Sequence, residues 1–552
     1  MKRNAQVRTI AFALLLALCA GLLSGCGSGS AQPAAETAAP SSFTVEEPTP
    51  TTEPTASPAP VVDYDALDYT TEKVVFKDKH NEYAAYSLSR SMETCTLGNR
   101  SYSFEKSISE GDRAARIRET EELFQRLGID PELRICLYTT LKDTYIEDSS
   151  VYGRFGTLAG ADYTAAVLLG IYGEFCNYGM ATGYARLLAG ETPEAPGELP
   201  ADWAYYDLNY LCFQPKFSGE EDAALCEKLA LAFAADYVEK HGDAAYLELL
   251  RRSGEPEEAE AARAALLDFY AAQGVKPSLS PILYAMGGAN YEYRAKCEHA
   301  VFFMDQGWSD YFSVKQGLRP DSFLHEDYGQ VRTFFETMRE EMGKYRDYFS
   351  QYALPDDISA TRIYFLKKGA DSSFDGFSRG LGVIYINSLH AIMHEYTHVL
   401  TGNALVDASP KWQREGLATY YQVMFASFAR ESENFAMHYT RAEGDSFAVQ
   451  LEQELGRPFQ AETDWLYMCN MWTYYYDTYA FMDFRAESYN AYMAAVSFLD
   501  YLIREFGEQH VLDYLLDNHD LTTLTDMTFD ELRFAWQEDV EARFALLPKY
   551  NS

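Results

Sequence analysis

Two histidines four residues apart, with a glutamate directly after the first, constrain local structure more than any other feature of this sequence. The segment reads His394-Glu395-Tyr396-Thr397-His398. Residues i and i+4 of an α-helix lie one turn apart on the same face, so both imidazoles could bind one metal ion. Glu395 would then face a water molecule at that ion. Ten histidines occur among the 552 residues, so a chance match is the alternative interpretation.

The surrounding sequence favours a helix that ends at a loop and is followed by a second helix. A strand-like run at 381–386 precedes the motif, and Gly402 could end its helix. We expect this strand to form a sheet edge, where an extended peptide could pair with it. A catalytic zinc ion takes three protein ligands and keeps one position open. Glu415 lies seventeen residues after His398, in a helix predicted over 409–421, and is the candidate third ligand.

Together the two segments resemble one family of enzymes. The sequence HEYTH followed by W-x-x-E-G-x-A-T-Y, over residues 394–420, is similar to the gluzincin metallopeptidases. The likeness is greatest to the branch with thermolysin-like domains, which includes the zinc aminopeptidases. The resemblance implies that His394, His398 and Glu415 bind one Zn²⁺ ion. It also implies that Glu395 is the general base in the hydrolysis of a peptide bond.

The same branch has a tyrosine at the start of a helix with the pattern Y-x-x-G-A-x-V, where it stabilises the oxyanion. The segment YMAAVSFLDYL begins at Tyr492, although Ala495 stands in place of the glycine. The resemblance therefore implies a catalytic role for Tyr492. Tyr489, one turn earlier, is an alternative. A packing role for Tyr492 is another, because the chain holds 42 tyrosines.

Two departures from the family limit what the resemblance implies. No G-x-M-E-N segment, which aminopeptidases use to hold the N-terminus of a substrate, occurs upstream of the motif. Arg414 also replaces the asparagine that is common before the glutamate ligand. Endopeptidase and exopeptidase activity are therefore both open.

The first 61 residues are predicted to lie outside the folded body. Three basic residues and a short apolar run precede Leu-Ser-Gly-Cys at 23–26, which resembles a bacterial lipobox. This resemblance implies a signal peptide over 1–25 and lipidation of Cys26; an ordinary signal peptide or an uncleaved anchor is the alternative. Residues 26–61 have almost no large apolar side chains and are typical of a disordered linker. We therefore expect an extracytoplasmic protein that is attached to the membrane through lipid only.

Charge and length exclude some functions and bound the number of domains. The formal net charge of −37 argues against nucleic-acid binding, which needs clusters of lysine and arginine. A chain of this length exceeds what one compact core usually organises. We expect an N-terminal α/β domain at 62–280 and the metallopeptidase domain at 281–552.

The two expected domains resemble each other weakly. The segment NYGMATGYA at 177–185 matches REGLATYYQ at 414–422, and the strands RICLYTT and RIYFLKK begin at residues 134 and 362. Each domain also contains an amphipathic helix, a glycine and a second helix, in the same order. This order favours an internal duplication, although amphipathic helices look alike in many proteins. The first copy would be metal-less, because it has no HExxH motif and has Tyr178 in the place of Glu415.

These observations predict an α+β fold that is mainly helical with small mixed sheets. It would comprise a thermolysin-like domain preceded by a possible degenerate copy. The predicted function is zinc-dependent hydrolysis of peptide bonds in peptides or proteins. The alternative is a catalytically inactive lipoprotein that binds peptide or glycan at the cell surface. A structural zinc site is disfavoured, because such sites are usually closed by four Cys or His ligands.

Overall fold

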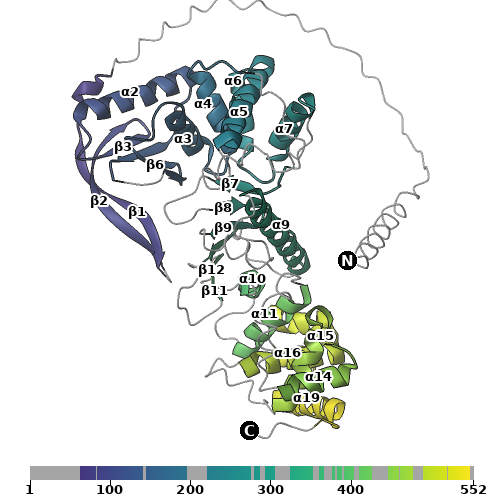
Figure 1. The fold of residues 1–552 in the computed structure, drawn as a ribbon. Helices are drawn as coiled ribbons and strands as arrows, with labels where there is room; N and C mark the ends of the chain where they lie inside the picture. Colours follow the sequence, from purple (N-terminus) through teal and green to yellow (C-terminus); the bar gives the residue numbers. More distant parts are fainter. Residues whose placement is uncertain are drawn as a thin grey trace, which may run out of the picture. The chain divides into compact units, whose positions relative to one another are not determined.

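The computed structural model describes the chain after residue 61, with gaps (Figure 1). The described residues are 62–81, 84–140, 144–194, 220–274, 279–285, 293–304, 324–351, 360–365, 376–378, 382–387, 391–402, 410–425, 445–458, 460–476, 489–518 and 520–547. The predicted signal peptide, the lipidation site at Cys26 and the linker lie outside them. Residues 63–552 form one compact unit. Within this unit we refer to residues 63–274 as the N-terminal half and to residues 279–547 as the C-terminal half.

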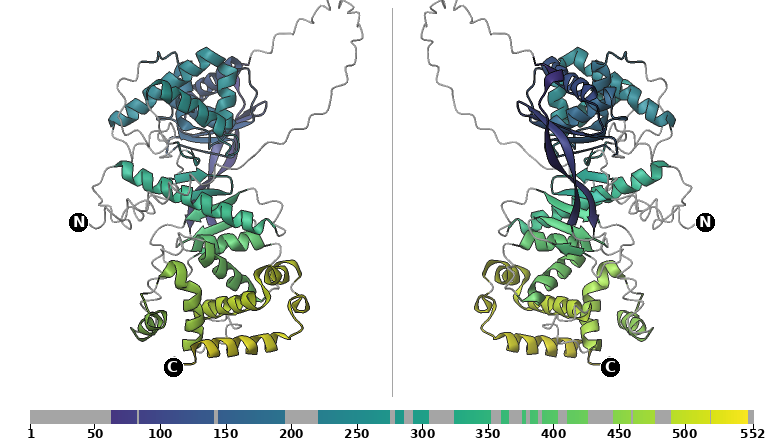
Figure 2. Two further views of the ribbon diagram at one scale, coloured as in Figure 1. Left: turned by 90° about the vertical axis from the view of Figure 1, so that its right-hand side faces the viewer. Right: turned by 90° about the vertical axis from the view of Figure 1, so that its left-hand side faces the viewer.

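The N-terminal half contains a six-stranded mixed sheet in the order β1-β2-β3-β4-β6-β5. Its strands are β1 (Thr70–Asn81), β2 (Ala84–Leu97), β3 (Arg100–Glu105), β4 (Leu133–Tyr138), β5 (Tyr145–Glu147) and β6 (Ser150–Arg154). The β1–β2 and β2–β3 pairs are antiparallel, β4 is parallel to β3 and β6, and β5 is antiparallel to β6. Figure 2 shows β1 and β2 side by side as the long purple ribbon.

The C-terminal half contains a second six-stranded mixed sheet, in the order β11-β12-β10-β9-β8-β7. Its strands are β7 (Leu283–Ala285), β8 (Tyr293–Lys296), β9 (Ala300–Met304), β10 (Thr361–Phe365), β11 (Gly376–Ser378) and β12 (Val383–Ile386). The β7–β8 and β8–β9 pairs are antiparallel, β10 is parallel to β9 and β12, and β11 is antiparallel to β12. The two sheets therefore have the same strand order and the same strand directions.

A long helix makes the parallel crossover in each sheet, because parallel neighbours cannot be joined by a tight turn. Helix α2 (Glu110–Leu127) joins β3 to β4, and α9 (Leu324–Phe349) lies between β9 and β10 in the chain. Helix α2 begins at the N-cap Ser109, whose side chain accepts from the Asp112 N–H, and ends at the left-handed Gly128.

Further helices follow each sheet. In the N-terminal half they are α3 (Gly160–Tyr172), α4 (Tyr178–Leu188), α5 (Glu220–His241), α6 (Asp243–Arg252) and α7 (Glu260–Ala272). In the C-terminal half they are α10 (Ala391–Thr401), α11 (Lys411–Phe425), α14 (Asp445–Leu455), α15 (Ala461–Tyr476), α16 (Tyr489–Phe506), α17 (Glu508–Leu512), α18 (Leu521–Leu524) and α19 (Phe529–Phe544). The prediction of a mainly helical α+β fold with mixed sheets is thus confirmed.

The helices of the C-terminal half form a packed layer around α16. Helix α11 lies against α10 and α16, and α15 lies against α16 and α19. Trp465, Trp472 and Tyr475 of α15 are buried, so the aromatic side chains of this helix contribute to the core. Among the described helices, none is both long and apolar enough to cross a membrane.

Candidate metal centre

Helix α10 presents its two histidines away from the core. Its buried apolar side chains recur at Ile392, Tyr396 and Val399, which is the spacing of one helix face. His394 and His398 fall on a neighbouring face and are only partly buried. The helix ends at Thr401, directly before Gly402, as the sequence predicts.

Helix α11 brings Glu415 to the same place. The next residue is Gly416, and a Cβ atom there would lie 3.2 Å from the Cβ of Ala495 on α16. Such a contact is tighter than ordinary packing, so glycine lets α11 approach α16 closely. The position of Glu415 over α10 therefore depends on a close contact made by its neighbour in sequence.

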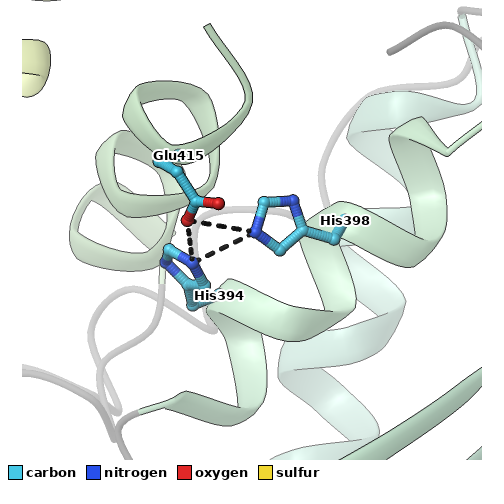
Figure 3. Close-up of side chains that lie close together, drawn as sticks. All are labelled: His394, His398 and Glu415. Carbon is cyan, nitrogen blue, oxygen red and sulfur yellow. Dashed lines mark hydrogen bonds and ion pairs between the residues drawn. The ribbon is translucent and has the colours of Figure 1, made fainter. Parts of the chain in front are cut away.

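Three donor atoms converge between α10 and α11 (Figure 3). The Nε2 atoms of His394 and His398 lie 3.2 Å apart. The Oε2 atom of Glu415 lies 3.2 Å from the Nε2 of His394 and 3.5 Å from the Nε2 of His398. A zinc–ligand distance of about 2.0–2.1 Å places neighbouring donors of a tetrahedron about 3.3–3.4 Å apart. The three atoms thus have the spacing of three corners of such a tetrahedron.

The charges of this cluster also suit a cation. Within the part of the chain that the structure describes, this is the only group of three or more His, Cys, Asp or Glu side chains that could hold a metal ion. Burial raises the pKa of Glu415, but hydrogen bonds from the two imidazoles outweigh it and hold that pKa well below its ordinary value. Glu415 is therefore an anionic donor at neutral pH, as a metal ligand must be.

Glu395 is buried beside this cluster, against strand β11. Its carboxylate accepts a hydrogen bond from the backbone N–H of Ser378. Burial is the largest influence and raises the pKa of Glu395 to about 7; His394 and the Ser378 N–H oppose this rise, and the carboxylate of Glu415 adds to it. A Cβ atom at Gly376 would lie 2.8 Å from the Cγ of Glu395, so only glycine fits there without displacing this side chain.

The strand that borders the site is not the one predicted from the sequence. We expected residues 381–386 to form the sheet edge, but β12 (383–386) lies between β10 and β11. Among the described strands, β11 (376–378) is the outer one on this side, and it is antiparallel to β12. The prediction failed because β11 has only three residues and no apolar alternation that could mark it as a strand.

The structure places Tyr492 near the cluster. It lies on the first turn of α16, and its ring centroid is 6.2 Å from that of His394. Its side chain is partly buried. Tyr489, the alternative, opens the same helix, but its side chain lies outside what the structure describes. Of the two tyrosines, Tyr492 is the one whose side chain the structure describes, and its ring lies near that of His394.

Thr419 is a site residue that the sequence reasoning missed. Its hydroxyl lies 3.3 Å from Nδ1 of His394, the nitrogen on the side of the ring away from the cluster. If Nε2 of His394 binds a metal ion, Nδ1 would carry the hydrogen and donate it to this hydroxyl. Thr419 follows Glu415 by four residues, so helical spacing from the third ligand could have identified it.

Replacing Thr419 by valine should weaken metal binding about tenfold, because partners of ligating histidines typically contribute this much to affinity. Valine keeps the shape of threonine and removes the hydroxyl. Serine at the same position should restore most of the affinity, since it keeps the acceptor. Competition with a chromogenic zinc chelator measures both variants. Equal affinity of the valine variant and the wild type would show that the hydroxyl does not position His394.

No protein-family model matches the chain, and no curated protein and no solved structure is significantly similar to it. The resemblance to gluzincins therefore depends on its short motifs. The geometry of the three donors is an observation independent of those motifs.

Proposed function

We propose that this protein is a zinc-dependent metallopeptidase of the gluzincin type, with a thermolysin-like domain in its C-terminal half. One observation carries the proposal: the three donor atoms of His394, His398 and Glu415 have tetrahedral spacing, with the carboxylate of Glu395 beside them. Two imidazole nitrogens and one carboxylate oxygen are a ligand set of catalytic zinc sites, which leave a further position for water.

The proposed chemistry needs one metal ion and two side chains that move or donate hydrogen. A zinc ion held by His394, His398 and Glu415 would supply a Lewis acid that acidifies water and polarises a peptide carbonyl. The carboxylate of Glu395 would take a proton from the attacking water and pass it to the leaving amine. Tyr492 donates its hydroxyl hydrogen to the oxyanion.

The substrate in this proposal is an extended peptide, either free or part of a protein. Strand β11 has β12 on one side and is the last described strand of its sheet on the other. An extended chain could pair by β-augmentation on the side of β11 that faces away from β12, and cross the cluster beside Glu395. Lipidation at Cys26 would hold the enzyme at the outer face of a membrane, where it would meet extracytoplasmic peptides. The net charge of −37 disfavours nucleic acid as a partner.

Removing the metal should abolish hydrolysis, and restoring zinc should recover it. The experiment uses residues 62–552, which include the whole compact unit, and a mixed peptide library read by mass spectrometry. A chelator that binds zinc should stop cleavage, because the Lewis acid is lost while Glu395 and Tyr492 remain. Readdition of zinc should restore the same cleavage products.

Two other results would argue against this proposal. Cleavage that persists in chelator, at metal content below detection, would mean that the three ligands serve another purpose. Metal bound without cleavage of any library peptide would favour the alternative, a peptidase-fold lipoprotein that binds peptide or glycan without hydrolysing it.

A further inference from the structure

The likeness between the two sheets extends to individual residues. Arg134 of β4 donates its backbone N–H to the carbonyl of Ser149, at 3.0 Å. Arg362 of β10 donates in the same way to the carbonyl of Gly382, at 2.7 Å. Both acceptors have positive φ angles, 54° at Ser149 and 71° at Gly382. Ser149 lies directly before β6, and Gly382 lies directly before β12. The same unusual turn therefore occurs at matching positions in both halves.

The helices that follow the sheets agree in the same way. The hydroxyl of Tyr184 on α4 donates to Asp243, the first residue of α6, at 2.7 Å. The hydroxyl of Tyr421 on α11 donates to Glu508, the first residue of α17, at 3.0 Å. Each tyrosine lies five residues after the glycine of its G-[ML]-A-T segment. A tyrosine–carboxylate hydrogen bond thus joins corresponding helices in each half.

The glycines between the helices match as well. Gly242 caps α6 with φ 83° and ψ 165°, and Gly507 caps α17 with φ 85° and ψ 144°. Such φ values strain any residue with a Cβ atom, so a glycine is required at both positions. The two halves thus share a strand order, a turn, a hydrogen bond and helix caps. Chance similarity between amphipathic helices would not produce all four of these features.

The two halves differ where the C-terminal half has its metal ligands. Helix α3, the counterpart of α10, contains no histidine, cysteine or glutamate, and Asp162 in its first turn is its one carboxylate. Tyr178 stands at the position of Glu415. The N-terminal half therefore has the framework of the site without its ligands.

The strand edge beside the two sites differs too. Ile146 of β5 pairs with Val151, and Ser378 of β11 pairs with Ile384. Val151 and Ile384 occupy matching register positions in their sheets, so Ile146 corresponds to Ser378. In the C-terminal half Ser378 bonds to Glu395. In the N-terminal half the carbonyl of Ile146 accepts a hydrogen bond from Nη1 of Arg294, at 2.7 Å.

Arg294 belongs to β8 of the C-terminal half, and its side chain bonds to residues of the N-terminal half. Its side chain is only 5% exposed and forms a 2.5 Å ion pair with Glu174, in the turn between α3 and α4. Its guanidinium lies 5.7 Å from the ring centroid of Phe175. Phe175 itself packs with Leu283 of β7 in a separate buried cluster. A buried guanidinium needs a partner for its charge, and Glu174 supplies it across the two halves.

We infer that the N-terminal half is a second copy of the fold that carries the metal site, and that the edge beside its lost site has become a docking surface for the C-terminal half. This docking surface comprises Ile146, Glu174 and Phe175, and Arg294 is the residue that binds it. The N-terminal half is then a scaffold for the metal-bearing half and does not present this edge to a peptide. The inference does not depend on the proposed hydrolysis.

Amide hydrogen exchange of the full chain tests the docking surface. Arg294→Met keeps an apolar stem and removes the charge, which leaves Glu174 buried without its partner. Exchange in segments that contain 145–147 and 174–175 should become at least about tenfold faster. Exchange in α15 and α19 should stay at the wild-type rate, and so should the content of bound metal.

Arg332→Met is the matched control. The Arg332 side chain is 11% exposed and pairs at 2.8 Å with Glu336, one turn along the same helix, so the pair lies within one half. Its replacement should leave exchange at 145–147 and 174–175 unchanged. If Arg294→Met does not fold, Glu174→Gln provides the test, because it removes the same charge pair and keeps the shape. Unchanged exchange at the docking surface, or the same increase in the control, would overturn the inference.

Discussion

Replacing Glu395 by glutamine should leave the metal bound and lower peptide hydrolysis by about 10²–10⁴-fold, the range that a positioned general base contributes. Glutamine has the size of glutamate but cannot take a proton from water. The Glu395 side chain lies beside the donor cluster but supplies none of its three donor atoms. Its replacement should therefore change metal affinity little. Initial rates on a peptide identified from the library, with metal content measured on the same sample, give both quantities.

Glu121→Gln is a matched control for this variant. Glu121 is another buried glutamate; it accepts hydrogen bonds from Arg100 and Tyr102 in the N-terminal half. Its replacement should lower thermal stability and leave the hydrolysis rate unchanged below the unfolding temperature. A Glu395→Gln enzyme that keeps the wild-type rate would remove Glu395 from the mechanism while leaving the metal site intact.

Replacing Glu415 by alanine should lower zinc affinity by more than about 100-fold, because loss of a direct ligand exceeds the 10–100-fold cost of losing an outer partner. The two imidazoles would remain, but the anionic donor that completes the three corners would be gone. Hydrolysis should fall with metal occupancy. Excess zinc should recover it only in part, since the remaining ligands do not fix the ion. Zinc titration against a competing chelator measures the affinity.

Glu508→Gln controls for effects on helix α11 that do not involve metal. Glu508 accepts a hydrogen bond from Tyr421 of that helix and does not belong to the donor cluster. Its replacement should change stability and leave zinc affinity at the wild-type value. Wild-type affinity in Glu415→Ala would mean that the ion, if bound, is held elsewhere.

Helical spacing and a short motif were enough to predict most of the residues that the structure brings together at the site. The i, i+4 spacing predicted that His394 and His398 share one helix face, and the structure places their Nε2 atoms 3.2 Å apart. Glu415 was a candidate because it lies in the next predicted helix, and the resemblance implied its role as a ligand; no local pattern states how two helices cross. Thr419 was missed, although it lies one turn from Glu415 on the same helix.

The sheets show why the rest of the fold could not be read from local sequence. Strand order depends on pairing between segments far apart in the chain, such as β9 and β10, and local patterns carry no information on those partners. Strand β11 is too short to have a period. The role of Arg294 was also beyond sequence reasoning, since an arginine in a strand is usually exposed and this one is buried against the other half.

The metal content of the wild-type protein tests the central claim most directly. The protein is purified without chelator, and elemental analysis gives the moles of each metal per mole of chain. We expect about one zinc ion per chain, the occupancy of a single three-ligand catalytic site. A folded protein that holds no zinc, and takes up none when zinc is supplied, would contradict the account.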